Sequence, residues 1–577
     1  MANSYDLVIR GGRIVDGSGG EPFDGDVAVV GNRIAAVGRI DGRGAQEIDA
    51  AGCIVTPGFV DIHTHYDGQI TWENTLTPSS NHGVTTVLMG NCGVGFAPCK
   101  PEDRERLISV MEGVEDIPEV VMTKGLPWNW ESFPSYMDML ATRHADVDFA
   151  AQVPHAPVRV NVMGQRGADR EPATDAELAQ MTQIVAEGIR AGAFGVSTSR
   201  SIAHRDAKGA LAPMVRAEER ELMALAHGLR AAGAGVFQLL PAAHEGFDPT
   251  EEMELLKRIV DASGGRPLSF SLLNTMQFPE QMSVTLDLLD RVAAENYPIK
   301  AQVFARFVGV LQGLGASFHP FRFHPSYKAI AHLPLAERVR ALSQPDMRAR
   351  LLAEEPEHTN MVYLYFVSQA AELFPLGDPP NYEPNPDDKL GARAAQMGID
   401  VKELIYDLML ERNGEALFLL PASNFVGASL EPVRRMLEHP QTLVALGDGG
   451  AHYGTICDSS YPTFVLAYWT RDRTLGKKLP LPWAIRALSH ANTEAIGIKD
   501  RGLVAPGLIA DLNVIDYDAL QLRAPRMVYN LPAGGGRLTQ QAEGYVATIK
   551  SGVITYRNGQ PTGQLPGRLL RNPVVAP

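Results

Sequence analysis

The chain contains little cysteine and no long apolar run. Its four cysteines, spread over 577 residues, cannot build a disulfide framework, so a reducing compartment such as the cytoplasm is expected. No stretch approaches the about 18 uninterrupted apolar residues that a transmembrane helix needs. The N-terminal stretch also lacks the basic region and apolar segment of a signal peptide. We therefore expect a cytoplasmic protein with no membrane partner.

Positive charge is also scarce. Lysine and arginine number 52 against 67 aspartates and glutamates, which gives a net charge of −15. A field of this sign repels phosphate, so we expect no binding to nucleic acid. Apolar residues make up 45% of the chain, which is enough to fill a large core and excludes a disordered or fibrous protein.

Both ends of the chain are rich in short β-type segments separated by glycine turns. Residues 1–55 and residues 501–577 share this texture. We expect them to form the two parts of one small β-sandwich, the second part ending in a C-terminal tail. The intervening residues 56–500 are then a larger domain inserted into the sandwich.

The inserted region alternates apolar β-branched runs with helical stretches, which is typical of a parallel sheet buried on both faces. The candidate strands are residues 54–62, 85–89, 148–153, 195–198, 235–239, 267–272, 418–420 and 442–446. About eight such strands predict an α/β fold of the (β/α)8, TIM-like barrel type, with its chemistry at the carboxyl ends of the strands. Residues near 101–140 and 319–389 do not fit the repeat, and we interpret them as insertions over the barrel mouth.

The strongest chemical signal is a His-X-His pair at the end of the first candidate strand. His63 and His65 are two residues apart, so on a strand both side chains point to the same side. Two converging neutral imidazoles are suited to a metal ion such as zinc. We interpret this pair as metal ligands rather than as unrelated strand histidines.

Two further residues follow candidate strands and are flanked by glycine. Cys92 lies between Asn91 and Gly93 after the second strand, where its thiolate would be a good zinc ligand, although a free cysteine is often only a small buried side chain. Asp448 lies between Gly447 and Gly449 after the last strand. A carboxylate at that place can accept the proton of a metal-activated water and later protonate a leaving amine, although aspartate is also common in glycine-rich turns.

Weaker candidates follow other strands. Additional site residues of this kind are His155, His204, Gln238, His244, Asn274 and His452. A histidine in such a loop more often serves as a hydrogen-bonding group than as a ligand. Gln238 and Asn274 are suited to binding substrate or to satisfying the backbone.

Several stretches together resemble the amidohydrolase superfamily, and specifically its N-acyl-D-amino-acid deacylase, or D-aminoacylase, branch. They are residues 7–17, 55–65, 90–93, 447–449, 500–502, 506–507, 510–512 and 566–571. The resemblance covers nearly the whole chain, and Asn-Cys-Gly in this position is specific to that branch. It implies a barrel with a β-sandwich and zinc-dependent amide hydrolysis. It also implies His63, His65 and Cys92 as ligands, with Asp448 as acid/base and further ligand.

The sequence departs from that family at two places. The family usually has a histidine at the end of its fifth strand and another at its sixth, where this chain has Gln238 and Leu272. We therefore expect one zinc ion, or at most two divalent ions, held by His63, His65, Cys92 and Asp448 in some combination, with one of the other histidines as a substitute. The family's carboxylate-binding arginine after the catalytic aspartate is also missing, and Arg200 or Arg306 would have to compensate as substrate-binding residues.

These observations predict a metal-dependent hydrolase of a linear amide C–N bond in a small molecule. The substrate would be an N-acyl amino acid, including an N-acyl-D-amino acid, or a related amide without that carboxylate. One alternative is a cyclic-amide hydrolase of the hydantoinase type, and another is a non-catalytic binding protein on an amidohydrolase scaffold. Barrel enzymes of this size often assemble, so a homo-oligomer is a further expectation.

Overall fold

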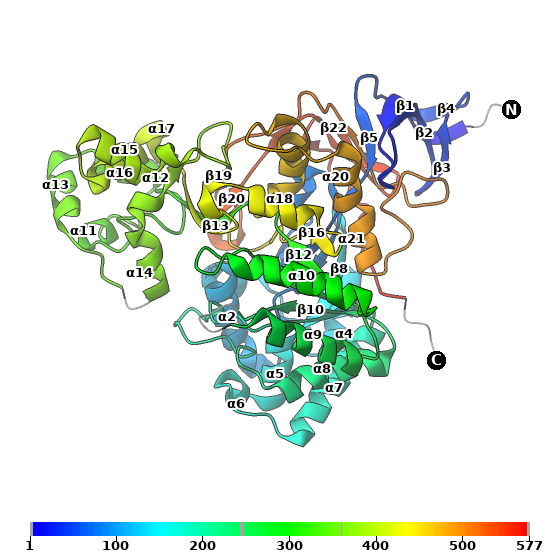
Figure 1. The fold of residues 1–577 in the computed structure, drawn as a ribbon, viewed down its shortest axis with the longest axis horizontal. Coiled ribbons are helices and arrows are strands. Elements are labelled where there is room, and N and C mark those ends of the chain that lie inside the picture. The colour runs from blue at the N-terminus through cyan, green and yellow to red at the C-terminus, as the bar shows by residue number, and fades with distance from the viewer. Residues whose placement is uncertain (1–3, 243–246, 359–360, 574–577) are drawn as a thin grey trace.

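The computed structural model describes residues 4–242, 247–358 and 361–573. Its strands fall into a nine-stranded sheet, an eight-stranded parallel sheet and three small sheets. In Figure 1 strands β1 to β5 of the nine-stranded sheet lie at the upper right, most helices lie around the parallel sheet, and a separate group of helices lies at the left. None of the described helices combines the length and the apolar character needed to span a bilayer.

Both ends of the chain contribute to the nine-stranded sheet. Its order is β24-β23-β22-β17-β5-β1-β2-β3, with β4 paired to β1. The strands are β1 (Ser4–Ile14), β2 (Phe23–Val30), β3 (Arg33–Gly38), β4 (Arg43–Asp49), β5 (Ile54–Pro57), β17 (Leu512–Ile515), β22 (Tyr545–Lys550), β23 (Val553–Arg557) and β24 (Gln560–Pro561). Strand β17 pairs antiparallel with β5, so that Leu512 lies opposite Pro57. The sheet has its own apolar core, which includes Ile9, Val27 and Val514.

The eight-stranded sheet is parallel throughout, as expected for strands buried on both faces. In chain order its strands are β6 (Phe59–Thr64), β7 (Val84–Met89), β8 (Asp148–Pro154), β9 (Gly195–Ser199), β10 (Val236–Leu240), β11 (Leu268–Leu272), β12 (Ile299–Val303) and β16 (Thr442–Val444). The sheet is curled. Beyond β16, the Asp448 N–H donates to the His63 carbonyl (3.1 Å) and the His65 N–H donates to the Gly449 carbonyl (2.7 Å). The segment after the last strand therefore runs beside the first, and the predicted α/β class is confirmed.

One predicted strand of the parallel sheet is wrong. Residues 418–420 belong to β15 (Phe418–Ser423), which pairs with β13 (Val308–Gln312) and β14 (Phe374–Pro375) in a separate three-stranded sheet. The seventh parallel strand is instead β12. Its sequence places Lys300 and Gln302 between apolar residues, which broke the continuous apolar run that identified the other strands.

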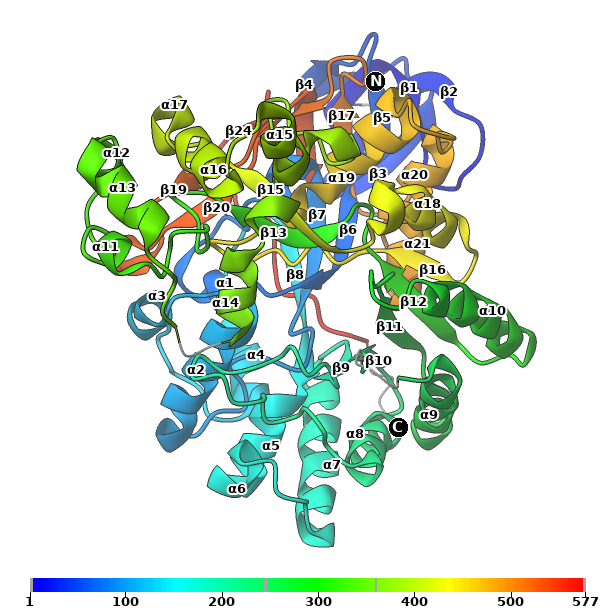
Figure 2. The same cartoon turned by 60° about the vertical axis from the view of Figure 1, so that its left-hand side comes forward.

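Helices surround the parallel strands. In Figure 2, α7, α8, α9 and α10 lie outside β9 to β12. The N-terminus of α7 is fixed by a capping box in which Thr174 and Glu177 bond each other's backbone N–H groups. The helices that lie between or after these strands in the sequence, apart from two long segments, are α1 (Gln69–Trp72), α5 (His155–Met163), α6 (Gln165–Ala168), α7 (Asp175–Arg190), α8 (Glu219–Ala232), α9 (Pro249–Ala262), α10 (Glu280–Ala294), α18 (Glu431–Glu438), α19 (Tyr461–Phe464), α20 (Leu481–Leu488) and α21 (His490–Ala495).

Two helical segments interrupt this pattern. Residues 101–140 contain α2 (Arg104–Glu115), α3 (Glu119–Gly125) and most of α4 (Phe133–Ala141). A second segment forms a lobe with its own apolar core, visible at the left of Figure 1. Its helices are α11 (Pro325–Lys328), α12 (Leu335–Leu342), α13 (Pro345–Ala353), α14 (Met361–Ser368), α15 (Leu390–Met397), α16 (Val401–Met409) and α17 (Glu411–Gly414).

The short ladders near the C-terminus complete the fold. Strand β18 (Gln521–Leu522) pairs with β21 (Ala542–Glu543), and β19 (Arg526–Val528) pairs with β20 (Arg537–Thr539). The chain after β24 then returns to the parallel sheet. There the Phe149 N–H of β8 donates to the Arg568 carbonyl, and the Leu570 N–H donates to the Phe149 carbonyl.

Candidate metal centre

The His-X-His pair lies at the carboxyl end of β6, the first parallel strand. The side chains of His63 and His65 are 2% and 1% exposed, and their ring centroids are 5.6 Å apart. Burial lowers the pKa of His63 to about 4, so its imidazole is neutral and retains a free lone pair.

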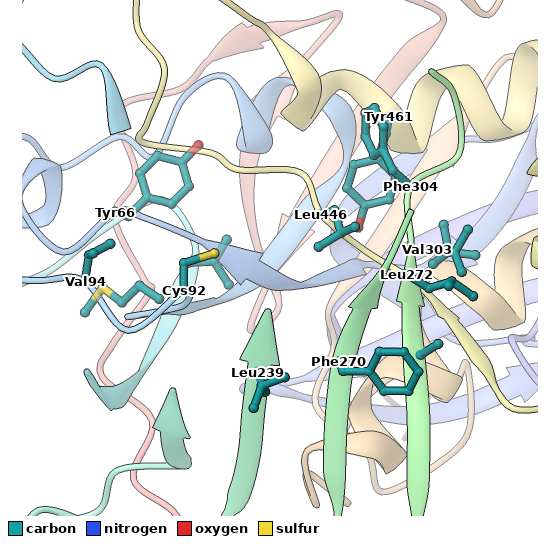
Figure 3. Close-up of a cluster of buried hydrophobic side chains, with 14 of the residues drawn as sticks. Tyr66, Cys92, Val94, Leu239, Phe270, Leu272, Val303, Phe304, Leu446 and Tyr461 are labelled. Atoms are coloured by element: carbon teal, nitrogen blue, oxygen red, sulfur yellow. The ribbon is translucent and has the colours of Figure 1, made fainter. Parts of the chain in front are cut away.

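Cys92 approaches this pair from the end of β7. It has a positive φ of 56°, and Gly90 and Gly93, which also have positive φ angles, let the backbone turn sharply around it. Its Sγ lies 3.3 Å from His63 Nε2, and its N–H donates to Gln238 Oε1 at 3.1 Å. Burial raises the pKa of the Cys92 thiol to about 11, so a thiolate here requires a nearby cation. Figure 3 shows Cys92 beside a cluster of apolar side chains that includes Leu239, Leu272, Val303 and Leu446.

Asp448 completes the arrangement from the segment that follows β16. Its Oδ1 lies 3.5 Å from the Nε2 atoms of both His63 and His65. Burial alone would raise the pKa of Asp448, but His65 and His63 outweigh it and hold this pKa well below its usual range. The carboxylate is therefore ionised and available as an acceptor.

The donor set is one that zinc accepts. The ligand atoms of His63, His65 and Cys92 lie within 4.8 Å of one another, and the part of the chain that the structure describes has no second group of this kind. Two imidazoles, a thiolate and a carboxylate are the ligand types of zinc sites. Burial opposes a charge on His65, but Glu115 and Asp448 raise its pKa well above the usual value. The His65 imidazole thus holds a proton with which a metal ion would compete for the ring nitrogen.

Most of the chain matches one known protein family. A model described as "Amidohydrolase family" matches residues 46–556, which is most of the chain. The chain belongs to the amidohydrolase family. The curated D-aminoacylase of Alcaligenes xylosoxydans xylosoxydans is 34% identical over 195 residues, which are 34% of this chain and 37% of that relative. The matched part therefore spans little more than a third of that relative's length.

Solved structures extend the likeness over the whole fold of this amidohydrolase. A D-aminoacylase from work on its binuclear metal centre superposes with a TM-score of 0.66 at 23% identity, covering 98% of this chain and 100% of that chain. The N-acyl-D-glutamate deacylase of Bordetella bronchiseptica, in complex with zinc and a phosphonate inhibitor, gives 0.64 at 21% identity, covering 99% and 100%. At these identities the likeness shows a shared fold.

Two of the weaker histidines face the centre of this amidohydrolase without joining the group of three. His452 Nε2 lies 3.4 Å from Glu115 Oε2. His204 is half-buried, and its Nδ1 has no hydrogen-bond partner among the described residues. Burial and the nearby His452 and His65 lower its pKa to about 3. Both belong to the surroundings of the metal group.

His155 lies in a different network. Its Nδ1 contacts Thr198 Oγ1 at 2.8 Å and its Nε2 contacts Glu221 Oε1 at 2.7 Å, so both ring nitrogens are used. Asn274 joins two loops, since its N–H donates to Asn424 Oδ1 at 2.7 Å and its carbonyl accepts the Asn424 N–H. His244 lies outside the described residues.

The two candidate arginines are both paired. Arg306 is 1% exposed, donates to Asp458 Oδ1 (2.8 Å) and to the Cys457 carbonyl (3.0 Å), and lies 3.9 Å from the ring centre of Tyr382. Arg200 pairs with Glu252 and retains 29% of its side-chain exposure. Of the two, Arg200 keeps the greater freedom to meet a ligand.

Two residues at this site escaped the sequence analysis. Gln302, on β12, places its Oε1 2.6 Å from His63 Nδ1. Glu115, the last residue of α2, places its Oε1 3.5 Å from His65 Nδ1. Gln302 lies on β12, whose polar residues break the apolar pattern of a buried strand, and Glu115 lies at the end of a helix outside the strand pattern.

Proposed function

We propose that this chain is a metal-dependent hydrolase of linear amide C–N bonds in small molecules, with zinc as its metal. One observation carries the proposal: His63, His65, Cys92 and Asp448 bring two imidazoles, a thiol and a carboxylate together at the carboxyl edge of the parallel sheet. These four residues would hold one zinc ion, because the fifth- and sixth-strand positions carry Gln238 and Leu272, and Leu272 offers no ligand atom.

A bound zinc ion would supply a Lewis acid that polarises the amide carbonyl and makes water more acidic. Asp448 would take the proton of the attacking water and transfer it to the departing nitrogen, which leaves as a neutral amine. The neighbouring imidazoles keep this carboxylate ionised before it accepts the proton. The buried walls of the site would limit the water that competes for these contacts.

The substrate class follows from the relatives and from the charged side chains. The similar proteins named above are deacylases of N-acyl-D-amino acids, which supports an N-acyl amino acid or a related amide. Arg306 is buried against Asp458, so Arg200 is the better candidate for a substrate carboxylate. His204 and His452 would contact the substrate from the surrounding loops.

We also infer the domain arrangement that holds this site. The hydrogen bonds between the β6 end and residues 448–449 support closure of the parallel sheet into a barrel over residues 56–500. The nine-stranded sheet supports a sandwich built from residues 1–55 and 501–577. The helical segments at 101–140 and 319–389 are then insertions into the barrel.

The test combines metal analysis with an amide screen. Protein purified without chelator is expected to hold about one zinc ion per chain and to hydrolyse N-acetyl-D-amino acids or their neutral analogues. His63→Ala and Cys92→Ala should lose zinc and turnover together, while His144→Ala, a change outside the site, should lose neither. A wild-type protein that binds no added zinc would overturn the proposal. Hydrolysis of hydantoins without hydrolysis of linear amides would show that the substrates are cyclic amides instead.

A further inference from the structure

We propose that Gln302 and Glu115 are positioning residues that orient the two histidines of the metal centre, Gln302 acting on His63 and Glu115 on His65. This inference rests on the proposed zinc site. Each of the two residues contacts the Nδ1 atom of its histidine, while the Nε2 atom on the other side of each ring faces Asp448.

Gln302 fixes the tautomer of His63. Its side-chain amide nitrogen donates to Ser269 Oγ at 2.9 Å, which leaves Oε1 turned toward His63 Nδ1 at 2.6 Å. A carbonyl oxygen only accepts, so the imidazole proton must lie on Nδ1. The lone pair of Nε2 then points toward Cys92 Sγ and Asp448 Oδ1, where a metal ligand is needed.

Glu115 acts on His65 with a charge rather than an amide. Its side chain is 2% exposed, and its two oxygens lie 3.5 Å from His65 Nδ1 and 3.4 Å from His452 Nε2. Neither His65 Nδ1 nor Glu115 Oε2 has a hydrogen-bond partner among the residues described. A buried carboxylate facing Nδ1 favours a proton there and leaves Nε2 facing Asp448.

Glu115 also ties the insertion to the loop that carries Asp448. Its backbone carbonyl accepts the His452 N–H, and the neighbouring Asp116 accepts the Gly454 N–H at 3.0 Å. Asp116 has a positive φ of 52°, which ends α2 and turns the chain at this contact. Glu115 thus connects three parts of the chain: His65 at the end of β6, the insertion that contains α2, and the loop after β16.

The experiment measures zinc affinity by chelator competition in three variants. Gln302→Met keeps the side-chain length and removes the acceptor, Gln302→Glu keeps an acceptor oxygen, and Glu115→Gln keeps the shape and removes the charge. We expect Gln302→Met and Glu115→Gln to bind zinc about 10–100-fold more weakly than wild type, and Gln302→Glu to retain most of the affinity. Glu119→Gln, an exposed change in the same insertion, is the matched control.

Two further readouts separate positioning from folding. The thermal unfolding of the zinc-free variants is expected to match that of the zinc-free wild type, and the visible spectrum of the cobalt-substituted form is expected to change only in Gln302→Met and Glu115→Gln. Wild-type zinc affinity in both of these variants would overturn the inference while leaving the zinc site intact. Equal losses in Gln302→Met and Gln302→Glu would also overturn the role of the Gln302 acceptor. A wild-type protein that binds no zinc would overturn the proposed function as well.

Discussion

Asp448 owes its position to a backbone that few residues adopt. It has a positive φ of 46°, and the Gly447 beside it lies so close to Asp61 that a Cβ there would be 2.1 Å from Asp61 Oδ2. This crowding requires glycine at 447, and the turn then directs the Asp448 carboxylate at both imidazoles. The glycines around Asp448 are therefore part of the site's geometry.

Replacing Asp448 by asparagine tests its role as a proton carrier. Asp448→Asn keeps the shape of the side chain but cannot accept the proton, so we expect turnover to fall by about 10²–10⁴-fold. Zinc should remain bound, because His63, His65 and Cys92 are unchanged. The measurement is turnover together with zinc content, and Asp472→Asn, a half-exposed change, serves as the control. Turnover within a few-fold of wild type would remove the acid/base assignment.

At the scale of elements, the sequence predicted the strands that end at the candidate metal ligands, but it did not predict β12 or the helix end that also lie there. The apolar runs before His63, Cys92 and Asp448 identified β6, β7 and β16, because strands buried on both faces leave a continuous apolar signal. Strand β12 left no such signal, since Lys300 and Gln302 interrupt its apolar run. Glu115 could not be predicted either, because no local pattern shows which strand end the C-terminus of α2 will meet.

A buried ionic network links helices α5 and α8. His155 at the start of α5 contacts Glu221 of α8, which also pairs with Arg159. Burial raises the pKa of Glu221, but His155 and Arg159 outweigh it and lower this pKa to about 2. The ionised glutamate therefore stabilises the packing of α5 against α8 only while it keeps its charge.

This network predicts a pH dependence of stability. Because the folded-state pKa of Glu221 is below its unfolded value of 4.5, its contribution is complete above about pH 4.5 and is lost as pH falls toward about 2. Glu221→Gln should lower the free energy of unfolding at pH 7 by about 3 kcal/mol and flatten its decline between these pH values. Denaturant unfolding at several pH values gives the difference. A variant whose unfolding follows that of wild type at every pH would contradict the assignment.

At the scale of the whole molecule, a second buried network joins the two large sheets. Asp148 of β8 pairs with Arg501 at 2.5 Å and with Lys550 of β22 at 2.7 Å, and both cations also contact Asp511. Although burial raises the pKa of Asp148, Lys550 and Arg501 lower it below its usual value. Buried ion pairs thus join the parallel sheet to the nine-stranded sheet.

Removing one charge of this network should lower the free energy of unfolding of the protein. Asp148→Asn leaves Lys550 and Arg501 with less compensation in a buried place, so we expect a loss of about 3–5 kcal/mol in the free energy of unfolding. Turnover at moderate temperature should persist, because Asp148 lies outside the group formed by His63, His65 and Cys92. Denaturant unfolding and turnover of the folded variant give both results. An unchanged unfolding midpoint would show that the network contributes no net stability.

The pairing of β17 with β5 forms only late in the synthesis of the chain. Strand β5 is complete at Pro57, but the partner that covers its edge ends at Ile515, about 460 residues later. At a synthesis rate of about 5–20 residues per second, this edge of β5 stays without its β17 partner for roughly 20–90 s. An open strand edge invites pairing with other chains. The yield of folded protein should therefore depend on the rate of translation and on chaperones that cover β5 until β17 has been synthesised.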